Sequence, residues 1–374
     1  MKTEVTINAD ILTWAITRAG YELHEMLDKV PNVRKWLSGE KKPTVKQLEE
    51  FSNTVHLPYG YFFLPEPPNE KLSFPFFRTK SAIDTRVSVN IYDTILLVKQ
   101  RQDWLREYLL DNGYDSLPFV GKYHNLHDVQ EIVANIRETL GLDLHWASTF
   151  STWQDAQDHL VEHIEEKGII TVFNGVVENN AHRSISVEEC RGFVLVDTMA
   201  PFMFINNADS KSAQMFTIVH ELAHIWIGQS AGFDNNNLQP ANDPIERLCD
   251  MVAAEFLVPE RAFISVWQKN RSFTVASKYF KVSEIVIARR ALDTQQITSK
   301  EFHDFYNDYM NREYVKKGKT SGGDFYATTK KRLSITFASH VDTAVKSGAL
   351  LYRDACKLTS LKGDTFHTFF TEHL

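Results

Sequence analysis

Apolar residues recur at helical spacing through the first 70 residues, in short runs that turn residues interrupt. The clearest run stops at Gly20 and contains Ile11, Leu12, Ala15, Ile16 and Ala19. Thr44 is a good N-cap for a later helix that carries Leu48 and Phe51. The pattern therefore predicts a small helical domain over residues 1–70.

The region from residue 71 to 270 alternates between helical and strand-like patterns. Helices are expected at 89–110, 127–140, 153–167, 212–227 and 244–257. Strand-like runs occur at 169–173, 192–197 and 202–206. Helices that flank a small sheet indicate an α+β domain.

Helical patterns return over residues 271–374. Residues 274–280 and 283–292, separated by a short turn, read as a helix-turn-helix pair. The sequence as a whole predicts an α+β, mostly helical protein with three domains, at 1–70, 71–270 and 271–374. The first and third are expected to resemble helix-turn-helix domains.

The composition narrows the class of protein. The 374 residues are 43% hydrophobic and contain three Cys, an odd number that argues against a disulfide framework. No apolar run reaches the roughly 18 residues of a membrane span, and the N-terminus has no signal-peptide core. We therefore expect a soluble cytoplasmic protein that does not associate with a membrane.

The charge is uneven along the chain. The net charge of -7 argues against a surface that holds nucleic acid throughout. Residues 311–335 nevertheless contain seven Lys and Arg against two Asp and Glu, a local charge of +5. The basic loop at 316–332 is thus the best candidate for a nucleic-acid contact, although solvated charged loops are more common.

The strongest chemical signal is His220-Glu221-Leu222-Ala223-His224, on a predicted helix. Two His four residues apart lie about 40° apart around the helix axis, so both imidazoles can reach one cation. Glu221 lies on a neighbouring face, where it can act on a water at the metal. The alternative reading is a core helix with incidental histidines.

A second predicted helix supplies the remaining groups. Catalytic zinc takes three protein ligands, and Glu246 is a suitable third ligand beside His220 and His224. Asp250, one turn beyond Glu246, can accept a hydrogen bond from the outer nitrogen of a ligating His. The set predicts a Zn²⁺ site that combines His220, His224 and Glu246.

The predicted metal chemistry is hydrolysis of a peptide bond. Zinc lowers the pKa of a bound water and polarises a carbonyl, and Glu221 would pass the proton to the leaving amine. The strand that ends at Ile205 and Asn206 precedes the metal helix, so its edge is expected to hold an extended substrate. A further group is expected to stabilise the oxyanion. Candidates by residue type alone are Tyr279, His303 and Arg289, for each of which an ordinary surface or core role is the commoner reading.

These residues resemble the ImmA/IrrE family of zinc metallopeptidases. The likeness includes Gly192-Phe193, Ile205-Asn206, Phe216-Thr217, Glu246 with Asp250, and Ala253-Ala254 with Leu257 and Pro259. In the first 70 residues Trp36, Gly39, Pro43-Thr44 and the tail from Phe62 to Pro68 resemble the XRE-type helix-turn-helix domain of longer members. Cys249-Asp250 departs from the Ala-Asn of many members. Since an acid or an amide can hold a His, the metal site is expected to survive the change.

The resemblance implies a zincin-like core and a gluzincin-like endopeptidase. Members cleave helix-turn-helix repressors or antitoxins in phage, mobile-element and toxin-antitoxin settings. The expected partner is therefore a repressor, antitoxin or toxin encoded nearby. The alternative is a DNA-binding regulator or antitoxin-like protein whose zinc fold is a platform for partners. Cys249 could then be a fourth, structural ligand, but helical spacing from Glu246 is expected to direct it elsewhere.

DNA binding by residues 1–70 is weakly supported. Only nine positions separate Leu27 from Trp36, too few for a turn and a normal recognition helix. The region also carries eight Lys and Arg against ten Asp and Glu. A domain used for protein contacts is thus the favoured reading. The helix pair at 274–292 is also a weak candidate for DNA binding, because its second helix begins with acidic and apolar residues.

Overall fold

The computed structural model describes residues 3–68, 88–125, 128–233, 243–312 and 324–374. The chain divides near residue 93 into an N-terminal unit and a larger unit that contains residues 94–374. Residues 220–224, the predicted metal motif, lie in the larger unit.

The N-terminal unit is a cluster of short helices. They are α1 (Ala9–Arg18), α2 (Leu23–Lys29), α3 (Val33–Leu37), α4 (Val45–Thr54) and the 3-10 turn η1 (Tyr59–Phe63). The Thr44 side chain caps α4 by accepting a hydrogen bond from Gln47 N, as predicted. Trp36, Phe51 and Phe62 form its buried aromatic core. The short α3 confirms that the third helix is truncated.

The larger unit begins with helices and a small sheet. Its first helices are α5 (Val89–Asp111), which begins at the end of the N-terminal unit, α6 (Val129–Leu140), η2 (Trp146–Thr149) and α7 (Trp153–Glu165). The strands are β1 (Ile170–Asn174), β2 (Val176–Val177), β3 (Asn180–Ser184), β4 (Gly192–Leu195), β5 (Phe202–Asn206) and β6 (Ala231–Phe233). The helices α8 (Lys211–Ile227) and α9 (Pro244–Leu257) stand on either side of β6 in the sequence.

Helices complete the chain. They are α10 (Glu260–Lys269), α11 (Phe273–Phe280), α12 (Glu284–Asp293), α13 (Ser299–Asn311), α14 (Phe325–Leu333), α15 (Ile335–Lys346), α16 (Tyr352–Thr359), α17 (Gly363–Thr368) and η3 (Phe369–His373). The pair α11–α12 confirms the two helices and turn expected at 274–292. Lys281 makes that turn with a φ of 54°.

The main sheet has the strand order β1-β5-β4-β6. β1 and β5 are parallel, whereas β4 runs antiparallel to both β5 and β6. The strands β2 and β3 form a separate two-stranded hairpin. Alternate residues of β5 face opposite ways. Met203 and Ile205 join the core that contains α8, while Phe202 packs edge-on against Phe337 of α15.

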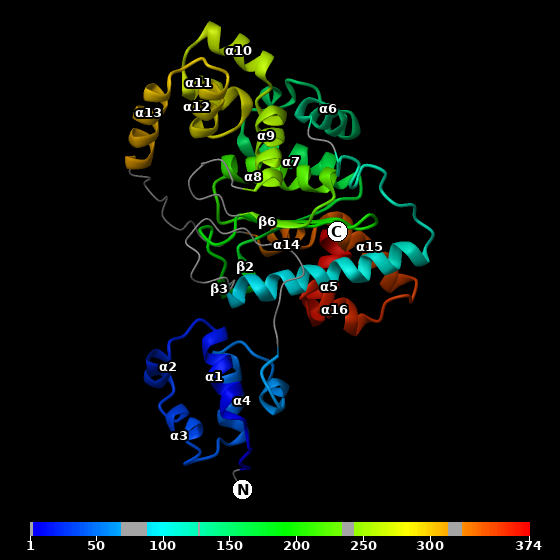
Figure 1. The fold of residues 1–374 in the computed structure, drawn as a ribbon. Helices are drawn as coiled ribbons and strands as arrows, with labels where there is room; N and C mark the ends of the chain where they lie inside the picture. The colour runs from blue at the N-terminus through cyan, green and yellow to red at the C-terminus, as the bar shows by residue number, and fades with distance from the viewer. Residues whose placement is uncertain (1–2, 69–87, 126–127, 234–242, 313–323) are drawn as a thin grey trace. The chain divides into compact units, whose positions relative to one another are not determined.

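Helices cover both faces of this sheet, with α8 and α9 on one side and α5 and α15 on the other (Figure 1). Gln102 of α5 anchors the second layer, because its amide donates hydrogen bonds to Leu195 O and Ala200 O at 2.7 and 2.9 Å. The observed α+β architecture, mostly helical around a small sheet, confirms the fold class in outline. The C-terminal helices thus contribute to the layers around the metal helix.

The expected substrate edge at Ile205 and Asn206 is wrong. β5 is flanked by β1 and β4, so both of its hydrogen-bonding edges are occupied. Ile205 and Asn206 are fully buried. The Asn206 amide donates to Ile185 O and Cys190 O at 3.1 and 2.9 Å, so it fastens the turn before β4. Position along the chain did not reveal this, because a strand's neighbours are set by topology.

The expected boundary at residue 270 falls inside one continuous core. Phe263 of α10 packs against Phe280 of α11 at a centroid distance of 6.4 Å, and both belong to the core around α8. The division into second and third domains is therefore not visible as a break in packing here. Hydrophobic periodicity is a local signal and does not show which helices share a core.

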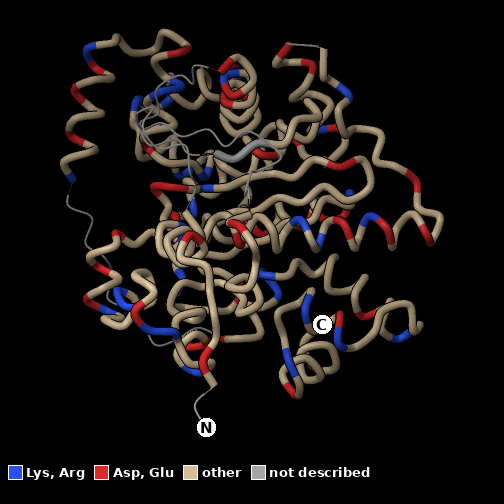
Figure 2. Tube along the Cα trace, turned by 60° about the horizontal axis from the view of Figure 1, so that its bottom comes forward, with Lys and Arg blue, Asp and Glu red and all other residues tan. Residues whose placement is uncertain are grey.

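Positive and negative residues are interspersed along the helices of the larger unit (Figure 2). Residues 313–323, which include the first part of the predicted basic loop at 316–332, lie outside the described residues, whereas 325–333 form the helix α14 instead of a loop. No helix in the described ranges is both long enough and apolar enough to cross a membrane.

Candidate metal centre

The metal motif lies on α8, a helix that is buried along most of its length. The Ser210 side chain accepts a hydrogen bond from Ala213 N at its start, and Gly228 ends the helix with a φ of 86°. Within this frame His220, Glu221 and His224 are at most 1% exposed. The sequence forms an apolar helix that carries its polar groups into the core.

The third candidate ligand lies in the first turn of α9. Asp243 caps this helix by accepting hydrogen bonds from Ile245 N and Glu246 N, and Pro244 occupies the first turn, where its missing N–H costs nothing. α9 packs along α8, which brings the Glu246 carboxylate to the two histidines.

Three ligand groups, two imidazoles and one carboxylate, converge from these helices and form a triangle. His220 Nε2 lies 3.1 Å from Glu246 Oε2, and His224 Nε2 lies 3.2 Å from Glu246 Oε1. The two Nε2 atoms are 3.2 Å apart. Ligands held at about 2.0–2.1 Å from a tetrahedral zinc would lie about 3.3 Å from one another. The triangle therefore fits one face of a zinc coordination shell.

The outer nitrogen of His220 is held by Asp250. Its Nδ1 lies 3.0 Å from Asp250 Oδ1. When Nδ1 carries the proton and donates it to the carboxylate, the Nε2 lone pair is directed at the other two ligands. The structure thus brings Asp250 to the position that the sequence predicts for it.

Glu221 is a fully buried carboxylate. Within the described part of the chain, neither of its carboxylate oxygens has a hydrogen-bond partner. Burial raises its pKa well above the ordinary value. A nearby cation would have the opposite effect, because positive charge favours the carboxylate. A buried carboxylate with free lone pairs beside a ligand triangle indicates a group that acts on something bound there.

Gly192 of β4 makes the space that Glu221 occupies. A Cβ at residue 192 would lie 3.2 Å from Glu221 Oε1, 2.6 Å from Thr217 Cγ2 and 2.9 Å from Phe204 O. A side chain at this position would therefore collide with α8 and β5. The resemblance included Gly192, but only the packing gives its reason.

Burial and hydrogen bonding act in opposite directions on the ligand pKa values. Burial would lower the pKa of His220, but its bonds to Asp250 and Glu246 outweigh burial and raise it to about 10. Burial would raise the pKa of Glu246, but bonds from His220 and His224 lower it to about 2. The pKa of His224 is lowered, chiefly by burial. Without a metal, these shifts favour the imidazolium form of His220 and the carboxylate form of Glu246.

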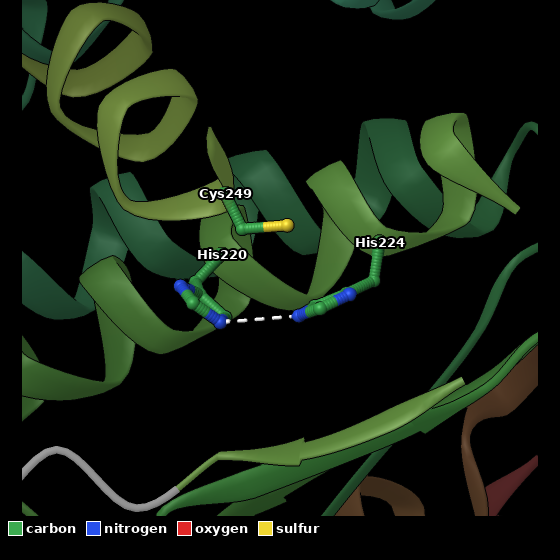
Figure 3. A group of neighbouring side chains, drawn as sticks. All are labelled: His220, His224 and Cys249. Carbon is green, nitrogen blue, oxygen red and sulfur yellow. Dashed lines mark hydrogen bonds between the residues drawn. The ribbon is translucent and has the colours of Figure 1, made fainter. Parts of the chain in front are cut away.

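Cys249 lies closer to the histidines than the sequence predicted. Its Sγ and ligand nitrogens of His220 and His224 are all within 4.8 Å of one another, and Figure 3 shows the thiol directed towards the two rings. The expectation that Cys249 points elsewhere is wrong, because a residue three positions from Glu246 still faces α8. Burial raises the pKa of this thiol well above its ordinary value, so the neutral form is favoured.

The three residues considered for stabilising the oxyanion, Tyr279, His303 and Arg289, lie in different parts of the larger unit. The Tyr279 hydroxyl lies 3.1 Å from His145 Nδ1, and His303 is exposed on α13. Arg289 of α12 pairs with Asp293 and lines a pocket that also contains Asp250. Arg289 is thus the candidate placed beside the metal-holding network.

Comparison with known families agrees with this geometry. Residues 165–292 match the family model Peptidase_M78, described as an IrrE N-terminal-like domain. This match supports the ImmA/IrrE family. It spans β1 to α12 and includes every residue of the metal cluster, and it supports a possible metallopeptidase role. The N-terminal unit lies outside it.

The C-terminal helices match a different model. Residues 333–372 match a domain of unknown function, DUF8813. No curated protein matches the chain. The C-terminal match covers α15, α16 and α17 and assigns no activity to them.

Proposed function

We propose that the protein is a zinc-dependent endopeptidase. The observation that carries this proposal is the convergence of His220 Nε2, His224 Nε2 and the Glu246 carboxylate within 3.2 Å of one another. His220, His224 and Glu246 would hold Zn²⁺, and Asp250 would orient His220. When bound, zinc supplies Lewis-acid chemistry, polarising the scissile carbonyl and lowering the pKa of water.

Glu221 is assigned the proton-transfer role. Its buried carboxylate takes a proton from the attacking water and delivers it to the leaving amine. The apolar surroundings of α8 exclude other water and strengthen each electrostatic interaction with the reacting atoms. Gly192 keeps open the space in which this carboxylate moves.

The substrate class comes from the family resemblance. A helix-turn-helix repressor or an antitoxin, encoded near this protein in a phage, mobile element or toxin-antitoxin locus, is the proposed substrate. Such a setting implies action in the cytoplasm.

The test uses the purified full-length chain and the regulator encoded beside it. We expect about one zinc per chain by metal analysis, and loss of that zinc in His224→Ala. Glu221→Gln should retain zinc while cleavage of the regulator, followed by mass spectrometry, is abolished. Full cleavage by Glu221→Gln would contradict the assignment of Glu221 as the base.

A second function is favoured by the position of Cys249. A thiol within 4.8 Å of the histidine nitrogens can complete a closed four-ligand site, which is typical of structural zinc. The protein would then be a DNA-binding or antitoxin-like regulator whose zinc fold is a platform for partners. The short α3 argues against a normal recognition helix in the N-terminal unit.

Cys249→Ala separates the two functions. An endopeptidase keeps its zinc and its activity in this variant, since the three ligands and Glu221 remain. A closed structural site loses zinc and stability. A salt-dependent shift of DNA by the full chain, with no cleavage of the regulator, would favour the second function.

A further inference from the structure

The helix α7 carries a second pair of histidines four residues apart. His159 and His163 have the same spacing as His220 and His224. Their ring centroids lie 4.4 Å apart with an interplanar angle of 73°, compared with 5.0 Å and 62° for the pair on α8. Two imidazoles on one face of a helix can reach one cation. The α7 pair therefore repeats the two-histidine part of the predicted zinc site.

His159 is held in place by aromatic neighbours. Its ring lies 4.8 Å from that of Phe150 and 6.3 Å from that of Trp146, centroid to centroid. Burial, and after it the neighbouring His163, lower the pKa of His159. The neutral imidazole is the form that ligates a metal. Packing on Phe150 accounts for His159, whereas the side chain of His163 is 25% exposed one helical turn further on.

Carboxylates accompany the pair at the end of α7. Glu166 Oε2 lies 3.9 Å from His163 Nδ1, and the Glu166 side chain is 57% exposed, so it can turn towards a cation between the two rings. Glu162 directly precedes His163 in the sequence. The helix ends at Glu165, and the negative end of its backbone dipole favours a positive charge there. A cation beside the two imidazoles would thus meet a favourable field.

The pair is accessible from a large cavity. This space has a volume of about 830 Å³, and its lining includes Asp155, His159, Glu162 and Glu166. It is polar on this side and has room for hydrated ions. Lys331 lines it from α14, but its charge is compensated by Asp158 at 2.8 Å. A metal ion can therefore reach His159 without opening the core.

The α7 pair is separate from the metal cluster, whose proposed ligands all lie on α8 and α9. Gln157 of α7 donates a hydrogen bond to Gln214 of α8 at 3.0 Å, six residues before His220. The two helices thus meet near the start of α8. Substitution of His159 or His163 therefore removes no ligand of the cluster.

We propose that His159, His163 and the Glu166 carboxylate form a second metal site, which binds a divalent transition-metal ion such as Zn²⁺. Imidazole is a ligand that suits Zn²⁺, Ni²⁺ and Cu²⁺, whereas Mg²⁺ prefers oxygen ligands alone. Water completes the coordination shell. Because these ligands are more exposed than those of the cluster, the second ion binds more weakly and exchanges with solvent. The inference does not depend on the endopeptidase function.

Calorimetric titration of the full-length chain with Zn²⁺ tests the site. The chain is first saturated with zinc and dialysed, so that only the tighter cluster stays filled. We expect one further equivalent of Zn²⁺ to bind. His159→Gln and His163→Ala should each weaken this binding by at least about tenfold, since loss of even an outer-shell partner of a metal ligand costs that much. His303→Ala is the matched control, because His303 is exposed on a different helix, α13.

The outcomes separate this site from the metal cluster. Absence of a further equivalent in the parent chain, or unchanged binding in both histidine variants, would overturn the proposal. Equally tight binding of Mg²⁺ would also overturn it, because carboxylates alone would then hold the ion. Both variants should keep the zinc that resists dialysis, and its loss would show that they disturb the cluster instead. A parent chain that binds the exchangeable ion but keeps none after dialysis would contradict the proposed endopeptidase and leave the α7 site established.

Discussion

Gly192→Ala is the sharpest test of how the sheet supports the metal helix. Gly192 pairs with Ile205 on β5 and with Phe233 on β6. The added Cβ would lie 2.6 Å from Thr217 Cγ2, a distance that real Cβ atoms essentially never show. Because the strand is held on both sides, α8 must move rather than β4.

The expected cost is that of overpacking a rigid core. Inserting a methyl group where it does not fit destabilises a protein by about 1–3 kcal/mol. The smaller conformational freedom of Ala in the unfolded chain recovers only about 0.4–1 kcal/mol. We therefore expect a net loss near 1–2 kcal/mol. Displacement of Thr217 and Glu221 should also reduce peptidase activity more than the lost stability alone would.

Urea unfolding of the zinc-loaded protein and cleavage assays at a temperature well below unfolding measure the two effects. Gly60→Ala is the control, because a Cβ there meets nothing within 4 Å and its φ is not positive. If Gly192→Ala were as stable and as active as Gly60→Ala, the claim that Gly192 makes room for Glu221 would be refuted.

Three further predictions concern protons, the outer carboxylate and the sheet. The pKa of His220 is raised to about 10, so zinc must displace its proton at neutral pH. Zinc affinity, measured by chelator competition, should fall about tenfold per pH unit as the pH drops from 9 to 6. The same raised pKa stabilises the metal-free fold below about pH 6.5, and urea titrations should show that contribution disappearing as the pH rises through 10. Asp250→Ala should accelerate zinc dissociation roughly 10- to 100-fold, whereas Asp250→Asn, which keeps an oxygen acceptor, should change it less; equal rates would contradict the orienting role. Asn206→Leu removes the hydrogen bonds to Ile185 O and Cys190 O and should cost about 1–3 kcal/mol in urea unfolding for each of them.

Elements with strong local signals were predicted well. β5 has the predicted bounds, and α9 runs from Pro244 to Leu257 as expected, because a cap and two prolines mark its ends. The strands β2, β3 and β6 were missed. β3 is polar and largely exposed, and β6 has three residues, so neither shows the periodicity of a buried strand.

In the candidate site, too, local spacing was predictable from the sequence and contacts between distant segments were not. His220 and His224 share a helix, and Glu246 and Asp250 share another, so spacing within each helix was sufficient to bring each pair to one face. Spacing said much less about Cys249, since the approach of α9 to α8 decides how close its thiol comes to the rings.

Distant contacts decide what the metal cluster can do. Glu221 keeps its buried carboxylate because Gly192, 29 positions earlier in the sequence, presents no side chain to it. The pocket beside Asp250 depends likewise on Met251 and Val286, which line it from α9 and α12. Nothing in the periodicity of either helix distinguishes these two residues from ordinary surface or core positions. The candidate metal ligands are therefore a property of two short segments, whereas the burial of Glu221 and the shape of the neighbouring pocket belong to the packing of the whole unit.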